Sequence, residues 1–140
     1  MRGCYPLGDE DGSIATARRC ALEFLNRAQA DNGVLITARA RDLTQLVVSE
    51  LVTNVRKYAP GPASMELLIT VDRIDVVVRD SEPAFPLAQT ADPSRIGQHG
   101  LEIVKAATTH LFIDQDQAGK RVTARITLLD TSAATTPPTV

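Results

Sequence analysis

Apolar residues recur at helical spacing in two long stretches of the first half of the chain. The first stretch opens on Ser13, an N-cap residue type, and ends at the turn signal Asp31-Asn32-Gly33. The second covers residues 38–58 and ends before Ala59-Pro60-Gly61-Pro62, because prolines around a glycine cannot continue a helix. Both patterns predict amphipathic helices that bury one stripe against a sheet. The first stripe is formed by Ile14, Ala17, Ala21, Phe24, Leu25 and Ala28.

The second predicted helix carries polar residues beside its apolar stripe, which is formed by Leu43, Leu46, Val47, Leu51 and Val55. Glu50 and Asn54 are four residues apart, so they lie on one face of the helix, and Lys57 and Tyr58 continue that face. A carboxylate and an amide at the edge of a core cost free energy unless they are partnered. The pair is therefore either a satisfied internal hydrogen bond or the wall of a binding site.

The remaining pattern predicts two pairs of strands and a third helix. Residues 65–71 and 74–78 alternate or are β-branched, and Asp72-Arg73 joins them as a hairpin. A helix begins at about Gly100, and residues 110–114 and 121–129 form the last pair of strands, joined by a polar turn. This order favours an α+β fold, a two-layer sandwich with about three helices on one face of a mixed, mostly antiparallel sheet.

We expect one domain over residues 13–130. Residues 1–12 form an N-terminal segment with room for an edge strand near Tyr5–Leu7, since Pro6 suits an edge. Residues 81–98 contain three prolines and little periodicity, as in a functional loop. Residues 131–140 hold only Thr, Ser, Ala, Pro and Val, which predicts a disordered tail.

Composition narrows the classes of function. The 140 residues carry a net charge of −2, and aromatic residues make up 4% with no Trp. Without a basic block or stacking aromatics, we expect no nucleic-acid partner and no membrane contact. No signal peptide or membrane-length apolar run is apparent, so we expect a cytoplasmic protein. Cys4 and Cys20 lack metal-ligand spacing and are expected to be reduced.

Three further segments could face Glu50 and Asn54. Asp80 ends a predicted strand, where an aspartate is often only a turn residue. Gly97 and Gly100 flank Gln98-His99 before a helix, and such glycines let backbone N–H groups approach an anion. Gly119-Lys120 opens the last strand. Each segment alone has an ordinary structural explanation, so only their order in the chain is specific.

That order resembles the GHKL, or Bergerat-type, ATP-binding domain. The matching segments, within Ser13–Leu129, are LVVSELVTNVRKYAPGP, VVVRDSEP, GQHGLEIV and GKRV. Within this group the chain is similar to the short anti-sigma-factor serine/threonine kinases common in actinobacteria. The resemblance implies ATP or ADP with Mg²⁺ as ligands, Asn54 as the metal ligand and Glu50 as general base.

The resemblance also implies roles around the nucleotide. Asp80 would accept a hydrogen bond from the adenine amino group, since an ionised carboxylate only accepts. Further candidate nucleotide-binding residues are Lys57, Tyr58, Gly97, His99, Gly100 and Leu101. By itself His99 is better explained as an ordinary loop residue, and Lys57 is equally well explained as a solvated cation at the end of a helix.

Two functions follow from this resemblance. The first is an ATP-dependent protein serine/threonine kinase that phosphorylates or sequesters an anti-sigma-factor antagonist or a sigma factor. Members of this group often pair as homodimers. The alternative is a non-catalytic protein-binding module with a degenerate or structural nucleotide site. The alternative stays open because Asp80-Ser81-Glu82-Pro83-Ala84 lacks both glycines that the broader superfamily has after this aspartate.

Overall fold

The computed structural model describes residues 1–8, 13–58, 61–80, 98–116 and 119–129. The helices are α1 (Ser13–Asn32), α2 (Ala38–Tyr58) and α4 (Gln98–Ala107). The first two begin and end where the apolar periodicity predicts. Helix α1 stops at Gly33, which has a φ of 66° that residues with a side chain rarely adopt. Helix α4 begins at Gln98, two residues before the predicted start.

The strands are β1 (Arg2–Leu7), β2 (Ala63–Thr70), β3 (Arg73–Asp80), β4 (His110–Asp116) and β5 (Gly119–Thr127). They form one sheet in the order β1-β2-β3-β5-β4, and every pairing between the described strands is antiparallel. The expected α+β sandwich is confirmed. The turn between β2 and β3 is Val71-Asp72, one residue earlier than predicted, because Thr70 pairs with Arg73.

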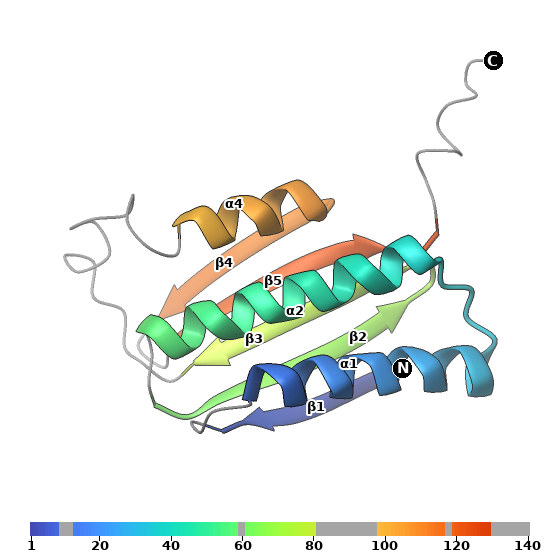
Figure 1. The fold of residues 1–140 in the computed structure, drawn as a ribbon, viewed down its shortest axis with the longest axis horizontal. Helices are drawn as coiled ribbons and strands as arrows, with labels where there is room; N and C mark the ends of the chain where they lie inside the picture. The colour runs from blue at the N-terminus through green and yellow to red at the C-terminus, as the bar shows by residue number, and fades with distance from the viewer. Residues whose placement is uncertain (9–12, 59–60, 81–97, 117–118, 130–140) are drawn as a thin grey trace, which may run out of the picture.

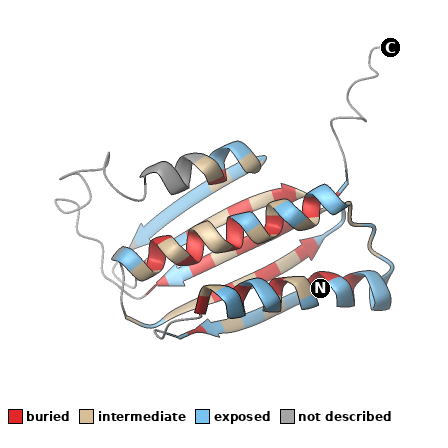
Figure 2. Ribbon diagram, in the orientation of Figure 1, coloured by how far each residue is buried: buried red, intermediate tan, exposed pale blue. Residues whose placement is uncertain are grey.

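The three helices cover one face of the sheet, with α2 lying between α1 and α4 (Figure 1). The core lies between the layers, and Figure 2 shows the buried positions of both layers facing it. Its largest fully buried side chains include Phe24, Leu25, Leu51, Met65, Leu67, Ile74, Ile126 and Leu128.

The buried arc of α2 is wider than the predicted stripe. Val48 and Val52 are fully buried, because α2 packs against two helices as well as the sheet. The prediction that Leu46 belongs to the buried stripe is wrong, since 38% of its surface is exposed. A prediction from period alone identified the helix but placed the edge of its buried face incorrectly.

Helix α2 runs along the whole sheet in the direction opposite to β5. Thr37, which precedes α2, donates its backbone N–H to the Leu128 carbonyl after β5 (3.0 Å). The other end of α2 therefore lies over the start of β5 and the last residue of β3, Asp80 (Figure 1). None of the helices within the described part of the chain is long and apolar enough to cross a bilayer.

Candidate functional site

The two ends of the sheet differ in what they carry, and we name each by one residue. The Asp80 end comprises Asp80, the start of β5 at Gly119, the start of α4 and the half of α2 that contains Glu50 and Asn54. The Val71 end comprises the Val71-Asp72 turn, Leu128-Leu129 and the connection before α2. Figure 1 places these groups at opposite ends of the same layers.

Asn54 is a buried amide without an internal partner. Its exposed fraction is 9%, yet its side chain makes no hydrogen bond with any residue that the structure describes. Over the described residues, the only fully buried side-chain polar atom without a hydrogen bond is Arg73 Nε, so the Asn54 amide keeps some contact with solvent. An amide that is accessible and has no described partner is available to a ligand. The first of the two interpretations, a satisfied internal hydrogen bond, therefore does not hold for Asn54 within the described chain.

Glu50 lies one turn before Asn54 and is half-buried. Its carboxylate forms neither an ion pair nor a hydrogen bond with the described residues. Helix geometry stacks Glu50 and Asn54 on one face. This end of α2 thus presents a carboxylate and an amide oxygen, the ligand types that suit a hard divalent cation or a positioned water.

Asp80 is buried at 8% exposure, and its Oδ1 accepts the backbone N–H of Lys120 at 3.2 Å. The contact is possible because β5 begins at Gly119, whose φ of 136° favours glycine. The carboxylate is thus fixed against the start of β5. Sequence reasoning placed Asp80 and Gly119-Lys120 in one site, and the structure brings them into contact.

The remaining candidates are located less fully. Lys57 is exposed in the last turn of α2, and Tyr58 is the last residue of that helix. His99, Gly100 and Leu101 belong to the first turn of α4, where only the backbone is described. Gly97 falls outside the described residues, as do the loop beyond Asp80 and the predicted tail. The start of α4 lies at the Asp80 end (Figure 1).

Arg56 was missed by sequence reasoning. Its guanidinium donates to the Gly8 carbonyl and to the Ser13 hydroxyl, both at 2.6 Å, so it ties the last turns of α2 to the end of β1 and the start of α1. Ser13 is 8% exposed and acts as an acceptor for this arginine. The only available signal was an arginine two residues after Asn54, which gives no information about its partner.

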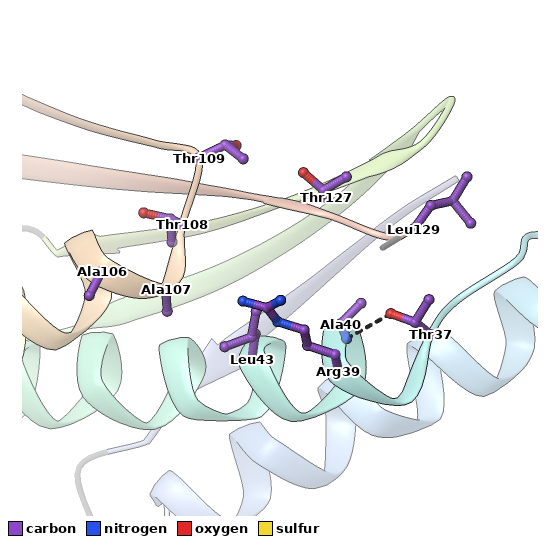
Figure 3. Close-up of a pocket in the computed structure, with 10 residues that line it drawn as sticks. All are labelled: Thr37, Arg39, Ala40, Leu43, Ala106, Ala107, Thr108, Thr109, Thr127 and Leu129. Atoms are coloured by element: carbon purple, nitrogen blue, oxygen red, sulfur yellow. Dashed lines mark hydrogen bonds between the residues drawn. The ribbon is translucent and has the colours of Figure 1, made fainter. Parts of the chain in front are cut away.

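A pocket is found at the Val71 end, away from Glu50, Asn54 and Asp80. It lies between the first turns of α2, the end of α4 and the last residues of β5, and Figure 3 shows the side chains around it. This pocket cannot be the site that the sequence predicts. Over the described residues, no group of three or more His, Cys, Asp or Glu side chains is arranged to hold a metal ion.

Comparison with known proteins agrees with the architecture. Residues 9–126 match the family model described as a histidine kinase-like ATPase domain. No curated protein matches the chain.

Two solved structures show the same fold. One is a histidine kinase domain from the blue-light activated histidine kinase of Erythrobacter litoralis EL346, with a TM-score of 0.52 and 17% identity. The match covers 82% of this chain and 60% of that one, so this chain spans less than two thirds of its length. The other is the histidine kinase AdeS of Acinetobacter baumannii, with a TM-score of 0.52, 11% identity and coverage of 91% and 68%. At these identities the likeness concerns the fold alone.

Proposed function

The chain belongs to the histidine kinase-like ATPase domain family, and on that basis we propose that it binds ATP or ADP with Mg²⁺ at the Asp80 end. The observation that carries the proposal is the side chain of Asn54, in a buried residue, beside Glu50, neither of which has a partner among the residues that the structure describes. Their position at the same end as Asp80 supports one shared site rather than separate structural roles.

The donor set fits the proposed ligands. The Asn54 amide oxygen would hold Mg²⁺, which when bound neutralises phosphate charge. Asp80, which accepts the Lys120 N–H, would accept a hydrogen bond from the adenine amino group, since an ionised carboxylate only accepts. Glu50 forms no ion pair with the residues that the structure describes, and its carboxylate would orient a hydroxyl or water. The first turn of α4 and Lys57 would meet the phosphates.

We further propose that the protein is a regulator of the anti-sigma-factor kinase type. In this role it transfers phosphate to a serine or threonine of a small anti-sigma-factor antagonist, binds a sigma factor, or does both. A homodimer is compatible with this role. The proposal rests on the four sequence segments together with the pairing of Glu50 and Asn54.

A non-catalytic binding module is the second candidate. The specific observation in its favour is that Asp80 already has a structural task, because its carboxylate accepts a backbone N–H of β5. The absence of both glycines after Asp80 points the same way. In that case the fold is retained for protein binding and Glu50 performs no chemistry.

Isothermal titration calorimetry with ATP, ADP and GTP, each with Mg²⁺ or with EDTA, tests the nucleotide site. We expect ATP and ADP to bind in the presence of Mg²⁺, and GTP to bind at least about tenfold more weakly, because guanine presents a carbonyl where adenine presents a donor. Absence of any binding at millimolar nucleotide would reject the site.

Transfer is tested with radiolabelled ATP and candidate antagonist domains from the same genome. Glu50→Gln should keep nucleotide binding and lose transfer, and the matched control Glu23→Gln, on the exposed side of α1, should behave as wild type. Transfer at an unchanged rate in Glu50→Gln would show that Glu50 is not the base. If wild type binds antagonist and nucleotide without transfer, the binding-module alternative is favoured.

A further inference from the structure

Four of the seven exposed large hydrophobic side chains of the described residues lie at the Val71 end. Val71 is 89% exposed, Leu35 72%, Leu129 41% and Met1 36%. Backbone hydrogen bonds hold these segments together, since Leu128 N–H donates to the Asp72 carbonyl and Ile69 N–H to the Met1 carbonyl. Isolated exposed apolar residues are common, but several on one end of a sheet indicate an interaction site.

The pocket at this end adds a concave feature to that surface. Leu43, Ala106, Ala107 and Leu129 supply apolar walls, while threonines supply hydroxyls. Several of these hydroxyls are already engaged. Thr37 donates to the Leu128 carbonyl and Thr109 to the Arg125 carbonyl. The walls are therefore suited to aliphatic groups more than to a polar small molecule.

Arg39 is the one charged side chain that lines the described pocket. In Figure 3 it extends from α2 over Leu43, toward the side of the pocket formed by α4. It makes no hydrogen bond or ion pair with the described residues, although the chain as a whole has a net charge of −2. An unpaired guanidinium beside apolar walls is complementary to a carboxylate next to aliphatic groups.

Beyond Arg125, whose carbonyl accepts the Thr109 N–H at 2.9 Å, none of the described strands pairs with the edge of β5 beside the pocket. Strand β4 begins at His110, which pairs with Arg125, so it does not extend along Ile126 and Thr127. Thr127 lines the pocket, and Figure 1 shows β5 continuing past the start of β4. Such an edge can accept an extended peptide through main-chain hydrogen bonds.

We propose that the Val71 end docks an extended segment of a partner protein, in which an acidic side chain lies next to aliphatic ones. The acidic group pairs with Arg39, the aliphatic side chains occupy the pocket between Leu43 and Ala107, and the peptide backbone follows the free edge of β5. Because this surface lies at the opposite end of the sheet from Asn54, docking does not require nucleotide.

The test begins with selection of short peptides from a phage-displayed random library on the intact protein, followed by measurement of the selected peptides by fluorescence polarisation. We expect an acidic residue beside aliphatic residues in the selected sequences. Arg39→Glu should weaken these peptides at least about tenfold, because it replaces attraction with like-charge repulsion. The matched control Arg19→Glu, an exposed arginine of α1, should leave affinity within about twofold.

Two further measurements separate docking at this surface from general charge effects. Ala106 is exposed and lines the pocket, so the ring introduced by Ala106→Trp would fill the pocket. This variant should lose peptide binding while its circular dichroism spectrum stays that of the wild type. A peptide whose acidic residue is replaced by lysine should bind the Arg39→Glu variant, because the swapped charges again attract each other. Saturating ATP should leave peptide affinity unchanged, so failure here and failure of the nucleotide site are distinguishable. Selection of no peptide, of peptides without an acidic residue, or of peptides insensitive to Arg39→Glu would overturn the proposal.

Discussion

The Asp80 end and the Val71 end of the sheet are built from the same helices and strands but differ in how their polar groups are hydrogen-bonded. At the Val71 end, short connections are locked by backbone hydrogen bonds, from Thr37 to Leu128 and from Leu128 to Asp72. At the Asp80 end, a buried amide and a half-buried carboxylate remain without described partners. The hydrogen bonds of the Val71 end contribute stability, although Arg73 Nε beside its turn is buried without a partner among the described residues. The amide and the carboxylate on α2 at the Asp80 end make no described hydrogen bond and stay available to a ligand, as expected of a binding site.

The largest effect is expected at the Asp80 end, where a substitution should lower nucleotide affinity without lowering the free energy of unfolding. Asn54→Ala should lower the affinity for Mg²⁺-ATP at least about tenfold, since loss of even an outer partner of a metal ligand costs 10–100-fold. Without nucleotide, the free energy of unfolding in urea should stay the same or rise, because Asn54 makes no hydrogen bond with the described residues and alanine has the higher helix propensity. Asn32→Ala, at the exposed end of α1, is the control. A loss of more than about 1 kcal/mol without nucleotide would instead make Asn54 a structural residue.

The Val71 end should show the reverse behaviour. The Thr37 hydroxyl accepts the Ala40 N–H at 3.0 Å and donates to the Leu128 carbonyl at 3.2 Å, so it caps α2 and fastens it to β5. Thr37→Ala should reduce the free energy of unfolding by about 1–2 kcal/mol. Nucleotide affinity, measured by calorimetry, should change less than about twofold. Thr37→Ser keeps the hydroxyl and should recover most of the loss; equal loss in both variants would exclude the cap.

A smaller change in the opposite direction is expected at the turn itself. Val71 has a φ of 53°, which is strained for a β-branched residue, and its side chain is 89% exposed and contributes little burial. Val71→Asn should stabilise the protein by up to about 1 kcal/mol, because asparagine adopts this conformation more readily. Thermal unfolding followed by circular dichroism measures the change. A destabilised variant would mean that the exposed valine makes a contact in solution.

The smallest effect appears only at high pH and involves Tyr5, on the edge strand between the two ends. Burial raises the pKa of the Tyr5 phenol above its ordinary value of 10.0, against the opposing charge of Arg27. Folding therefore favours the neutral phenol, and the associated stability is present below pH 10.0 and is lost as pH rises through the raised pKa. Tyr5→Phe should show a shallower loss of stability above pH 10.0 than wild type. Identical pH profiles would show that Tyr5 does not contribute.

Periodicity predicted the architecture because the helices and strands bury their apolar positions against one another. It predicted the bounds of α1 and α2 correctly and identified the two hairpins of the sheet. It misjudged Leu46 and omitted Val48 and Val52, since the width of a buried face depends on how many neighbours a helix has. No pattern in a single helix encodes that number.

The candidate site could be predicted only where its residues share an element or a strand pair. Glu50 and Asn54 follow from helical spacing, and Asp80 meets Lys120 because β3 and β5 are neighbours. Arg56 and Arg39 could not be assigned, because their surroundings come from segments distant in sequence. The catalytic or ligand roles of the site residues stay predictions until nucleotide binding is measured.

Helix α2 links the two ends as one uninterrupted element of 21 residues, about 30 Å at 1.5 Å per residue. Its interior contains no proline or glycine. A single residue inserted near Thr44 would turn everything after it by about 100°, since 3.6 residues complete one turn. Glu50 and Asn54 would leave their face while the cap at Thr37 stayed in place. The number of residues between Thr37 and Asn54 thus fixes which face of α2 carries the site. Insertions and deletions that preserve the site are therefore expected only outside this helix.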